Sequence, residues 1–162
     1  MSHDERRLIT TRHEFDEALR AAFAEVAAAG CRELWLCDDD FAAWPLNERA
    51  IVEHLAQWAM AHRHLTLIAR SFDEFPRRHA RWLEWRRVWS HVVSCRAVDE
   101  AQAAEVPTLL VAPGVVTVRL ADPVQCRGSV SWHAADLTKN RETAEAFFQR
   151  SGEALPVTLL GI

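Results

Sequence analysis

The sequence has few of the residues that build several common active sites. It has only five glycines and no glycine-rich loop, so it lacks the phosphate-binding loop of many nucleotide-binding proteins. No Gly-x-Ser-x-Gly occurs, and serine-based hydrolysis therefore has no support. The four cysteines, Cys31, Cys37, Cys95 and Cys126, form no closely spaced pair. We expect neither a zinc site built on paired cysteines nor a disulfide framework, and hence a reducing compartment.

Long apolar runs are also missing. No stretch approaches the roughly 20 apolar residues that a helix needs to cross a bilayer. The N-terminus has no apolar signal core. We therefore expect a cytoplasmic protein without a membrane partner.

Lysine is almost absent: Lys139 is the single lysine beside eighteen arginines. An excess of arginine and alanine is typical of GC-rich bacterial genomes, so single arginines carry little weight. The formal net charge of −4 argues against a general polyanion binder, although residues 62–96 hold eight arginines against three acids. We expect no nucleic-acid partner.

Aromatic residues alternate with arginines between Phe72 and Trp89, a pattern also found in proteins that bind single-stranded nucleic acid. On one helix from Phe75 to Ser90, however, Phe75, Trp82, Trp85 and Trp89 share about a quarter of the circumference. This stripe indicates a core or a subunit interface. Arg78 projects into the same stripe and would need a partner if buried.

The eight histidines do not form a metal-binding pattern. His62-x-His64 spans a junction between elements, and His133-x-x-Asp136 is isolated. No histidine pair has helical i, i+4 spacing beside a carboxylate. We expect no metal and no cofactor.

The first two thirds of the chain alternate between strand and helix patterns, which predicts a parallel βαβ block. Thr11 to Glu14 forms a capping box before a helix that Gly30 ends. Asn47 is the expected N-cap of a second helix. The expected strands are 8–10, 33–38, 65–69 and 92–95.

The pattern then changes to antiparallel additions. Pro113-Gly114 predicts a type II turn between strands 108–111 and 115–120, followed by a strand at 126–132. A last helix is expected from about Thr138 to Ser151, with Gly152 as its stop. The fold class is thus α/β with a mixed sheet, a late β-hairpin and a C-terminal helix. We expect a single domain over 1–162 with its core at about 8–151, and an apolar tail, 152–162, packed on the body or on a partner.

The buried strand 33–38 ends in three consecutive carboxylates, the first of them Asp38, and a neighbouring strand ends in Arg-Ser. Ligands bind beyond the carboxyl ends of strands in open α/β sheets. The charges at this edge form either a structural ion-pair network or a crevice for an anionic ligand; a magnesium site has less support because further carboxylates are not clearly placed. The candidate ligand-binding residues are Asp38, Asp39, Asp40, Arg70, Ser71, Arg77 and Arg78.

The order of elements over about residues 8–151 resembles one half of a phospholipase D-like domain, and the Leu160-Gly161-Ile162 ending is similar to that of small proteobacterial proteins of this type. Active members carry His-x-Lys-x4-Asp on the first strand of the late hairpin. Glu105, Pro107 and Ala112 occupy the corresponding places. The resemblance implies that the phosphodiesterase activity is absent and that no catalytic residue carries over. It also implies a homodimer, since family active sites form between two halves.

We therefore expect a non-catalytic, phospholipase D-like binding or scaffolding protein. The alternative is an enzyme or binder that acts on a small phosphorylated or anionic ligand in the Asp/Arg crevice.

Overall fold

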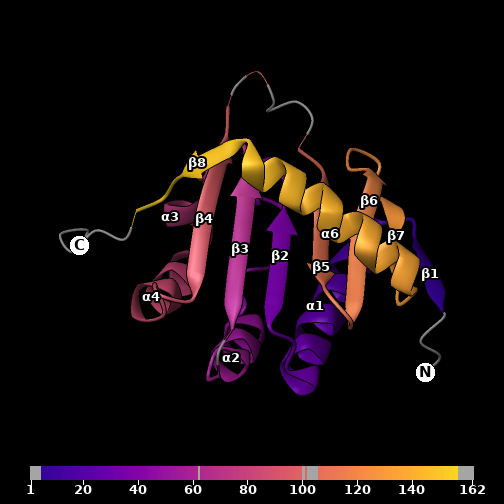
Figure 1. The fold of residues 1–162 in the computed structure, drawn as a ribbon, viewed down its shortest axis with the longest axis horizontal. Coiled ribbons are helices and arrows are strands. Elements are labelled where there is room, and N and C mark those ends of the chain that lie inside the picture. Colours follow the sequence, from indigo (N-terminus) through magenta and orange to yellow (C-terminus); the bar gives the residue numbers. More distant parts are fainter. Residues whose placement is uncertain (1–4, 62, 100, 102–105, 157–162) are drawn as a thin grey trace.

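A mixed β-sheet of eight strands forms the centre of the computed structural model, which describes residues 5–61, 63–99, 101 and 106–156 (Figure 1). The strand order is β1-β7-β6-β5-β2-β3-β4-β8. In chain order the elements are β1 (Arg6–Ile9), α1 (Arg12–Ala29), β2 (Glu33–Cys37), α2 (Arg49–Trp58), β3 (His64–Ala69), α3 (Phe75–Arg78), α4 (Ala80–Val88), β4 (Val93–Val98), β5 (Thr108–Ala112), β6 (Val116–Asp122), β7 (Arg127–Ser131), α6 (Ala134–Gln149) and β8 (Ser151–Glu153).

The predicted fold class is confirmed. Strands β2, β3 and β4 are parallel neighbours, as the βαβ pattern indicated. The late hairpin β5–β6 is antiparallel, and β5 joins the parallel block by pairing antiparallel to β2. Gly114 has φ +79° and Val115 N–H donates to Ala112 O at 2.9 Å, as the type II turn requires.

Two layers of helices cover the sheet. Helix α6 crosses one face diagonally, from the β7 side to β8 (Figure 1). It buries Leu137, Ala144 and Phe147 against residues of the central strands such as Leu109 and Val111. Helices α1, α2 and α4 contribute to the larger core cluster on the opposite face.

Helix boundaries follow the capping chemistry at α1. Thr11 accepts a hydrogen bond from Glu14 N–H at 3.0 Å, and Gly30 closes the helix with φ +70°. The Glu14 carboxylate binds the N–H and the hydroxyl of Thr10, both at 2.7 Å, rather than returning to the N-cap residue. The Thr11 half of the predicted capping box is thus confirmed. The second hydrogen bond, to the Glu14 carboxylate, comes from Thr10 instead of Thr11.

Three local predictions were wrong. Asn47 does not cap α2; its Oδ1 accepts from Arg81 N–H at 2.7 Å in the first turn of α4, and Glu48 stands at the N-cap of α2. The helix expected from Phe75 to Ser90 is broken at His79, with φ −128° and ψ 44°. Gly152 lies in β8, paired with Ala97, while the last helix begins at Ala134 and ends at Gln149.

The aromatic stripe belongs to the core: Phe75, Trp82 and Trp85 are buried within one chain. Of the predictions that fall outside the described residues, His62, Glu105 and the tail beyond Pro156 are the ones that bear on function. In the part of the chain that the structure describes, no helix has the length and apolar character needed to cross a bilayer.

Candidate functional site

Asp38 is the first residue after β2 and serves as an internal acceptor. It is 9 % exposed and accepts hydrogen bonds from Phe41 N–H at 2.8 Å and from the Thr108 hydroxyl at 2.6 Å. A weaker bond comes from Asp40 N–H at 3.3 Å. Burial raises the pKa of Asp38, and these hydrogen bonds act in the opposite direction. The carboxylate therefore ties the turn after β2 to the start of β5.

Asp39 and Arg70 form a closed ion pair. Arg70 Nε and Nη2 lie 2.8 and 3.0 Å from the two carboxylate oxygens of Asp39. The Asp39 carbonyl also accepts the backbone N–H groups of Arg70 and Ser71. The hydrogen bonds that Arg70 donates to Asp39 raise the pKa of Arg70 above its ordinary value. Within the Asp/Arg crevice, this arginine is already occupied by the protein's own carboxylate.

The other polar side chains at this edge order their own turns. Asp40 accepts from Ala42 N–H at 2.9 Å, and Ser71 accepts from Asp73 N–H at 3.1 Å. Both contacts are local side-chain caps that mimic a backbone turn.

Arg77 and Arg78 are not brought to the carboxylates of the crevice. Both guanidinium groups pair with Glu74 on their own segment. The expectation that Arg78 projects into the tryptophan stripe was wrong, because its side chain is 48 % exposed. The break at His79 is the reason, since a projection over one continuous helix does not hold across it. Ligand binding by the predicted set stays a prediction.

A hollow of about 370 Å³ does lie beside this edge, but its charge does not suit an anion. Asp38 and Asp39 line it. Its arginine, Arg12, donates to Ala43 O at 2.7 Å and pairs with Asp16. An anion would meet two carboxylates here and a cation that is already engaged.

A second site, which we call the polar pocket, lies under α6 on strands β1, β7 and β6. The strand register places Arg6, Ser131 and Thr117 in one cross-strand row, and Ser129 and Arg119 are partners in the next. Residues paired in this way present their side chains on the same face of the sheet. The pocket measures about 230 Å³. It is lined by Arg6, Thr117, Arg119, Ala121, Gly128, Ser129, Ser131, Asp136, Lys139 and Asn140.

The back wall of the polar pocket is a fixed hydrogen-bond network. Asn140 of α6 is buried; its Nδ2 donates to the Thr117 hydroxyl at 2.9 Å, and its Oδ1 accepts from Arg119 Nη1 at 2.8 Å. Thr117 in turn donates to Leu110 O at 2.8 Å. At the other end, Asp136 accepts from the Ser131 hydroxyl and from Arg6 Nη2, both at 2.6 Å. These two contacts lower the pKa of Asp136.

The remaining cations of this pocket have no carboxylate partner. In the described part of the chain neither Arg119 nor Lys139 forms an ion pair, whereas Arg6 is paired with Asp136. Two positive charges therefore stand beside the Ser129 hydroxyl. This pattern suits an anion.

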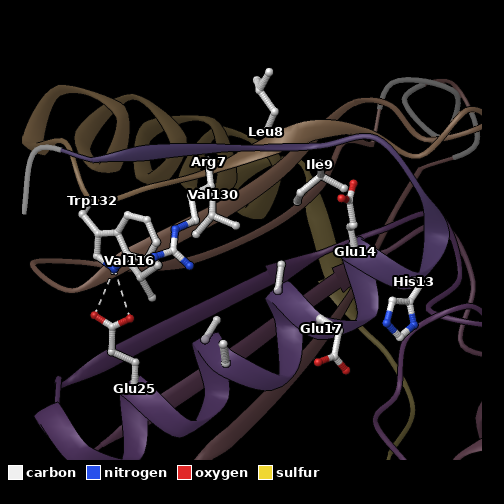
Figure 2. A pocket seen from close by; sticks show the side chains of 13 residues that line it. Arg7, Leu8, Ile9, His13, Glu14, Glu17, Glu25, Val116, Val130 and Trp132 are labelled. Atoms are coloured by element: carbon white, nitrogen blue, oxygen red, sulfur yellow. Dashed lines mark hydrogen bonds between the residues drawn. The ribbon is translucent and has the colours of Figure 1, made fainter. Parts of the chain in front are cut away.

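An apolar groove of about 680 Å³ lies on the opposite face, between β1 and α1 (Figure 2). Small side chains on α1, Ala18, Ala21 and Ala22, leave the space open, and Trp132 forms one wall. The Glu25 carboxylate accepts Trp132 Nε1–H, with 3.1 Å to each oxygen, while Leu8 points away from the hollow (Figure 2). The apolar side chains of the groove suit an apolar group.

The sequence predicted the carboxylates at the end of β2 but missed the polar pocket. Its residues alternate along two strands, as Thr117-x-Arg119 and Ser129-x-Ser131, and they meet only through the β6–β7 register. The alternation was a usable signal. The alternation does not predict the register between β6 and β7 or the position of α6. Among the residues that the structure describes, no group of three or more His, Cys, Asp or Glu side chains is arranged to hold a metal ion.

Comparison with known proteins gives a family and a fold. The sequence matches the family described as "Domain of unknown function (DUF7931)" over residues 15–158. No curated protein matches it in sequence.

Three solved structures are similar at low sequence identity. TrmBL2, an archaeal chromatin protein described as showing a novel mode of DNA binding, has a TM-score of 0.66 at 11 % identity, over 95 % of this chain and 55 % of that one. The present chain thus spans about half of TrmBL2. Nuc from Salmonella typhimurium, a phospholipase D family member, has a TM-score of 0.63 at 5 % identity, over 94 % of this chain and 99 % of that one. NucT from Helicobacter pylori has a TM-score of 0.60 at 7 % identity, over 93 % and 99 %. These similarities show a fold shared with phospholipase D family members.

Proposed function

The chain belongs to the DUF7931 family, and from the geometry of its polar pocket we propose that it binds a phosphate-bearing ligand without cleaving it. The observation that carries the proposal is the pair of cations, Arg119 and Lys139, left without carboxylate partners in a pocket lined by hydroxyl groups. Guanidinium and ammonium groups beside hydroxyl donors bind phosphate oxygens well.

The hydrogen-bond network at the back wall favours a specific binding site over non-specific attraction of anions to surface charges. Arg119 is held by Asn140, which is itself held by Thr117, so one face of the guanidinium is positioned before a ligand arrives. Such preorganisation lowers the entropy lost on binding. A pocket of about 230 Å³ has room for a phosphate and a few attached atoms, so the proposal concerns the phosphate group of a small ester or of one nucleotide unit.

The side chains of the pocket argue against turnover. None of its described lining residues is a histidine or a cysteine. The Ser131 hydroxyl donates to Asp136, and the Thr117 hydroxyl donates to a backbone carbonyl. In the described part of the chain, no histidine side chain is hydrogen-bonded to either hydroxyl; His133 reaches the Ser131 hydroxyl oxygen only through its backbone N–H, at 3.1 Å.

The phospholipase D motif is missing from the whole sequence as well as from its expected place. The single lysine, Lys139, has Leu137 two residues before it, so His-x-Lys occurs nowhere. Thr117 and Arg119 on β6 have the spacing of the motif's histidine and lysine, and Asp122 follows Arg119 by three residues where the motif has five. We infer that β6, rather than β5, carries the degenerate motif. This inference rests on the residue spacing in β6, and Nuc and NucT share the fold alone.

A ligand panel tests the proposal. We expect inorganic phosphate, a nucleoside monophosphate or a ten-residue oligonucleotide to raise the melting temperature, since a ligand at 100 times its Kd stabilises by about 2.7 kcal/mol. The double variant Arg119→Gln/Lys139→Gln should lose the shift. Arg141→Gln, which changes an arginine of α6 that is paired with Glu33 and Glu145, should keep it.

The panel also separates the alternatives. A shift by the monophosphate that equals the shift by the oligonucleotide indicates a small phosphate ester as the natural ligand. Hydrolysis of bis(4-nitrophenyl) phosphate that disappears in the double variant would contradict the non-catalytic proposal and restore the enzyme alternative.

The second candidate is a scaffolding role, favoured by the closed Asp39–Arg70 pair, which engages Arg70 with the protein's own carboxylate. The homodimer implied by the phospholipase D resemblance belongs to this candidate. Light scattering on the purified chain measures it directly. A dimer combined with no response to any ligand of the panel would favour scaffolding over phosphate binding.

A further inference from the structure

Arg86 of α4 is a buried cation without an acidic partner. It is 7 % exposed, and its Nε has no hydrogen-bond partner. Its Nη1 donates to the backbone carbonyl of Leu155. In the described part of the chain it forms no ion pair. Burial of an unpaired charge is unfavourable, so an anion bound beside Arg86 would stabilise it.

The guanidinium lines a cavity of about 480 Å³ at the outer edge of the sheet, which we call the edge pocket. This pocket opens where β8 ends: β8 pairs with Arg96 to Val98 and leaves the first half of β4 uncovered. Its lining residues are Arg86, Ser90, Val93, Ser94, Cys95, Arg96, Glu153, Ala154 and Pro156.

The uncovered half of β4 adds a backbone donor. Leu65 N–H donates to Val92 O on the β3 side, and Ala154 N–H donates to Cys95 O on the outer side. Because main-chain groups of successive residues point to opposite sides of a strand, Val93 turns its N–H to the same outer side as Cys95. Arg86 and Val93 N–H can therefore contact one bound group together.

The other charged groups of the edge pocket set the charge of its ligand. Arg96 is engaged: it donates to the hydroxyl and carbonyl of Ser151, and its guanidinium stacks on Phe148 with 4.3 Å to the ring centroid. Burial raises the pKa of the Cys95 thiol to about 11, so it is neutral. Glu153 contributes one negative charge to the lining. The charged lining is two arginines, Arg86 and Arg96, against one carboxylate, Glu153, a net charge of +1 that matches a monoanion better than a phosphate dianion.

The contact between Arg86 and the backbone of Leu155 is a poor substitute for an ion pair. Leu155 has φ +47°, a left-handed conformation that residues with a side chain seldom adopt. It presents its carbonyl to Arg86 in this conformation. A carbonyl dipole satisfies a guanidinium less well than a carboxylate does.

We propose that the edge pocket binds a small monocarboxylate, held by Arg86 and by the Val93 N–H. This site is separate from the polar pocket and does not rest on phosphate binding there.

The test compares propionate with its uncharged isostere propionamide on the full chain, at constant ionic strength, by NMR titration of backbone amides. Propionate should shift the Val93 and Ser90 amides in a saturable way, and propionamide should not. Arg86→Met should weaken binding by roughly tenfold or more. Replacing a buried charge by an apolar side chain is often neutral or stabilising, so this variant is expected to fold.

Arg87→Met is the matched control, because Arg87 is the next residue, is 53 % exposed and pairs with Glu84. It should bind propionate as the wild type does. The proposal is overturned if propionate gives no saturable shift, if propionamide gives the same shift, or if Arg86→Met retains full affinity. A loss of affinity in Arg87→Met equal to that in Arg86→Met would also overturn it.

Discussion

Three consecutive aspartates have three different environments. Asp38 is buried and accepts hydrogen bonds from two segments, Asp39 forms an exposed ion pair, and Asp40 caps a turn. Their side chains have different partners within one turn, which the chain leaves at Phe41 with φ +59°. Charge alone would treat the three residues as equivalent. Their contributions to stability should differ.

We expect Asp38→Ala to lower the free energy of unfolding by about 2–4 kcal/mol, because it leaves the Phe41 N–H and the Thr108 hydroxyl without their acceptor. Urea denaturation at neutral pH measures the change.

Asp39→Ala serves as the comparison within the cluster. Its ion pair with Arg70 is half exposed on both sides, and such pairs contribute roughly 0–1 kcal/mol. Equal losses in the two variants would contradict the assigned roles.

His79 holds the other side of the same turn. Its Nε2 lies 2.7 Å from Phe41 O, so this nitrogen carries the proton and donates, while the buried Nδ1 has no partner. Burial lowers the pKa of His79 below its ordinary value of 6.5. The unfolded chain therefore takes up the proton first as the pH falls.

We expect His79 to make the wild type lose stability as the pH falls through 6.5 towards the lower folded-state pKa. In His79→Gln this part of the pH dependence should disappear. Urea unfolding at about pH 7.5 and about pH 5.5 compares the two proteins. The same pH dependence in both would exclude His79 as its source.

At the scale of the element, a cap can serve a helix far away in sequence. Asn47 precedes α2 and looks like its N-cap, yet it accepts the Arg81 N–H of α4. The break at His79 creates the free N–H groups that need this acceptor.

Asn47→Ala should lower the free energy of unfolding by about 1 kcal/mol, the usual effect of losing a cap. Hydrogen exchange should become faster at the first turn of α4 and stay unchanged in α2. Faster exchange in α2 alone would support the local cap that the sequence predicted.

Gly128 fixes the contact between β6 and β7. A Cβ at this residue would lie 2.0 Å from Arg119 O and 2.6 Å from Leu120 Cα, both main-chain atoms. We expect Gly128→Ala to shift the register of β7, to destabilise the chain and to abolish phosphate binding in the polar pocket. Circular dichroism melting and the ligand panel measure the two effects, and Gly152→Ala, where a Cβ meets nothing within 4 Å, is the control.

The sequence was most informative where one element decides the outcome. The cap at Thr11, the stop at Gly30 and the turn at Gly114 are local, and all three were predicted. Asp38 was found as a buried strand end, but its partner Thr108 is 70 residues away. The polar pocket needed the β6–β7 register and the orientation of α6. Neither is determined by local spacing.

At the scale of the whole molecule, α6 connects the two edges of the sheet. It begins after β7 and delivers the chain to β8, which pairs with β4 near the opposite edge (Figure 1). On the way it covers apolar residues of the central strands, including Cys37 and Ile68. We propose that residues 5–156 fold as one cooperative unit.

A chain that ends at Trp132 should fail to fold cooperatively, because it exposes this apolar face. A chain of residues 5–156 should melt in a single transition. Calorimetry on both measures the result, and a sharp transition in the shorter chain would show that α6 is dispensable.

The pairing of β1 with β7 also sets an order of events during synthesis. Ile9 pairs with Gly128, so the first strand has no partner until nearly 120 further residues have been made. At typical translation rates of about 5–20 residues per second, this wait is roughly 6–24 s. During that time β2, β3 and β4 can assemble with their helices, while β1 stays unpaired. The first edge of the sheet can therefore close only after β7 has been synthesised, late in the production of the chain.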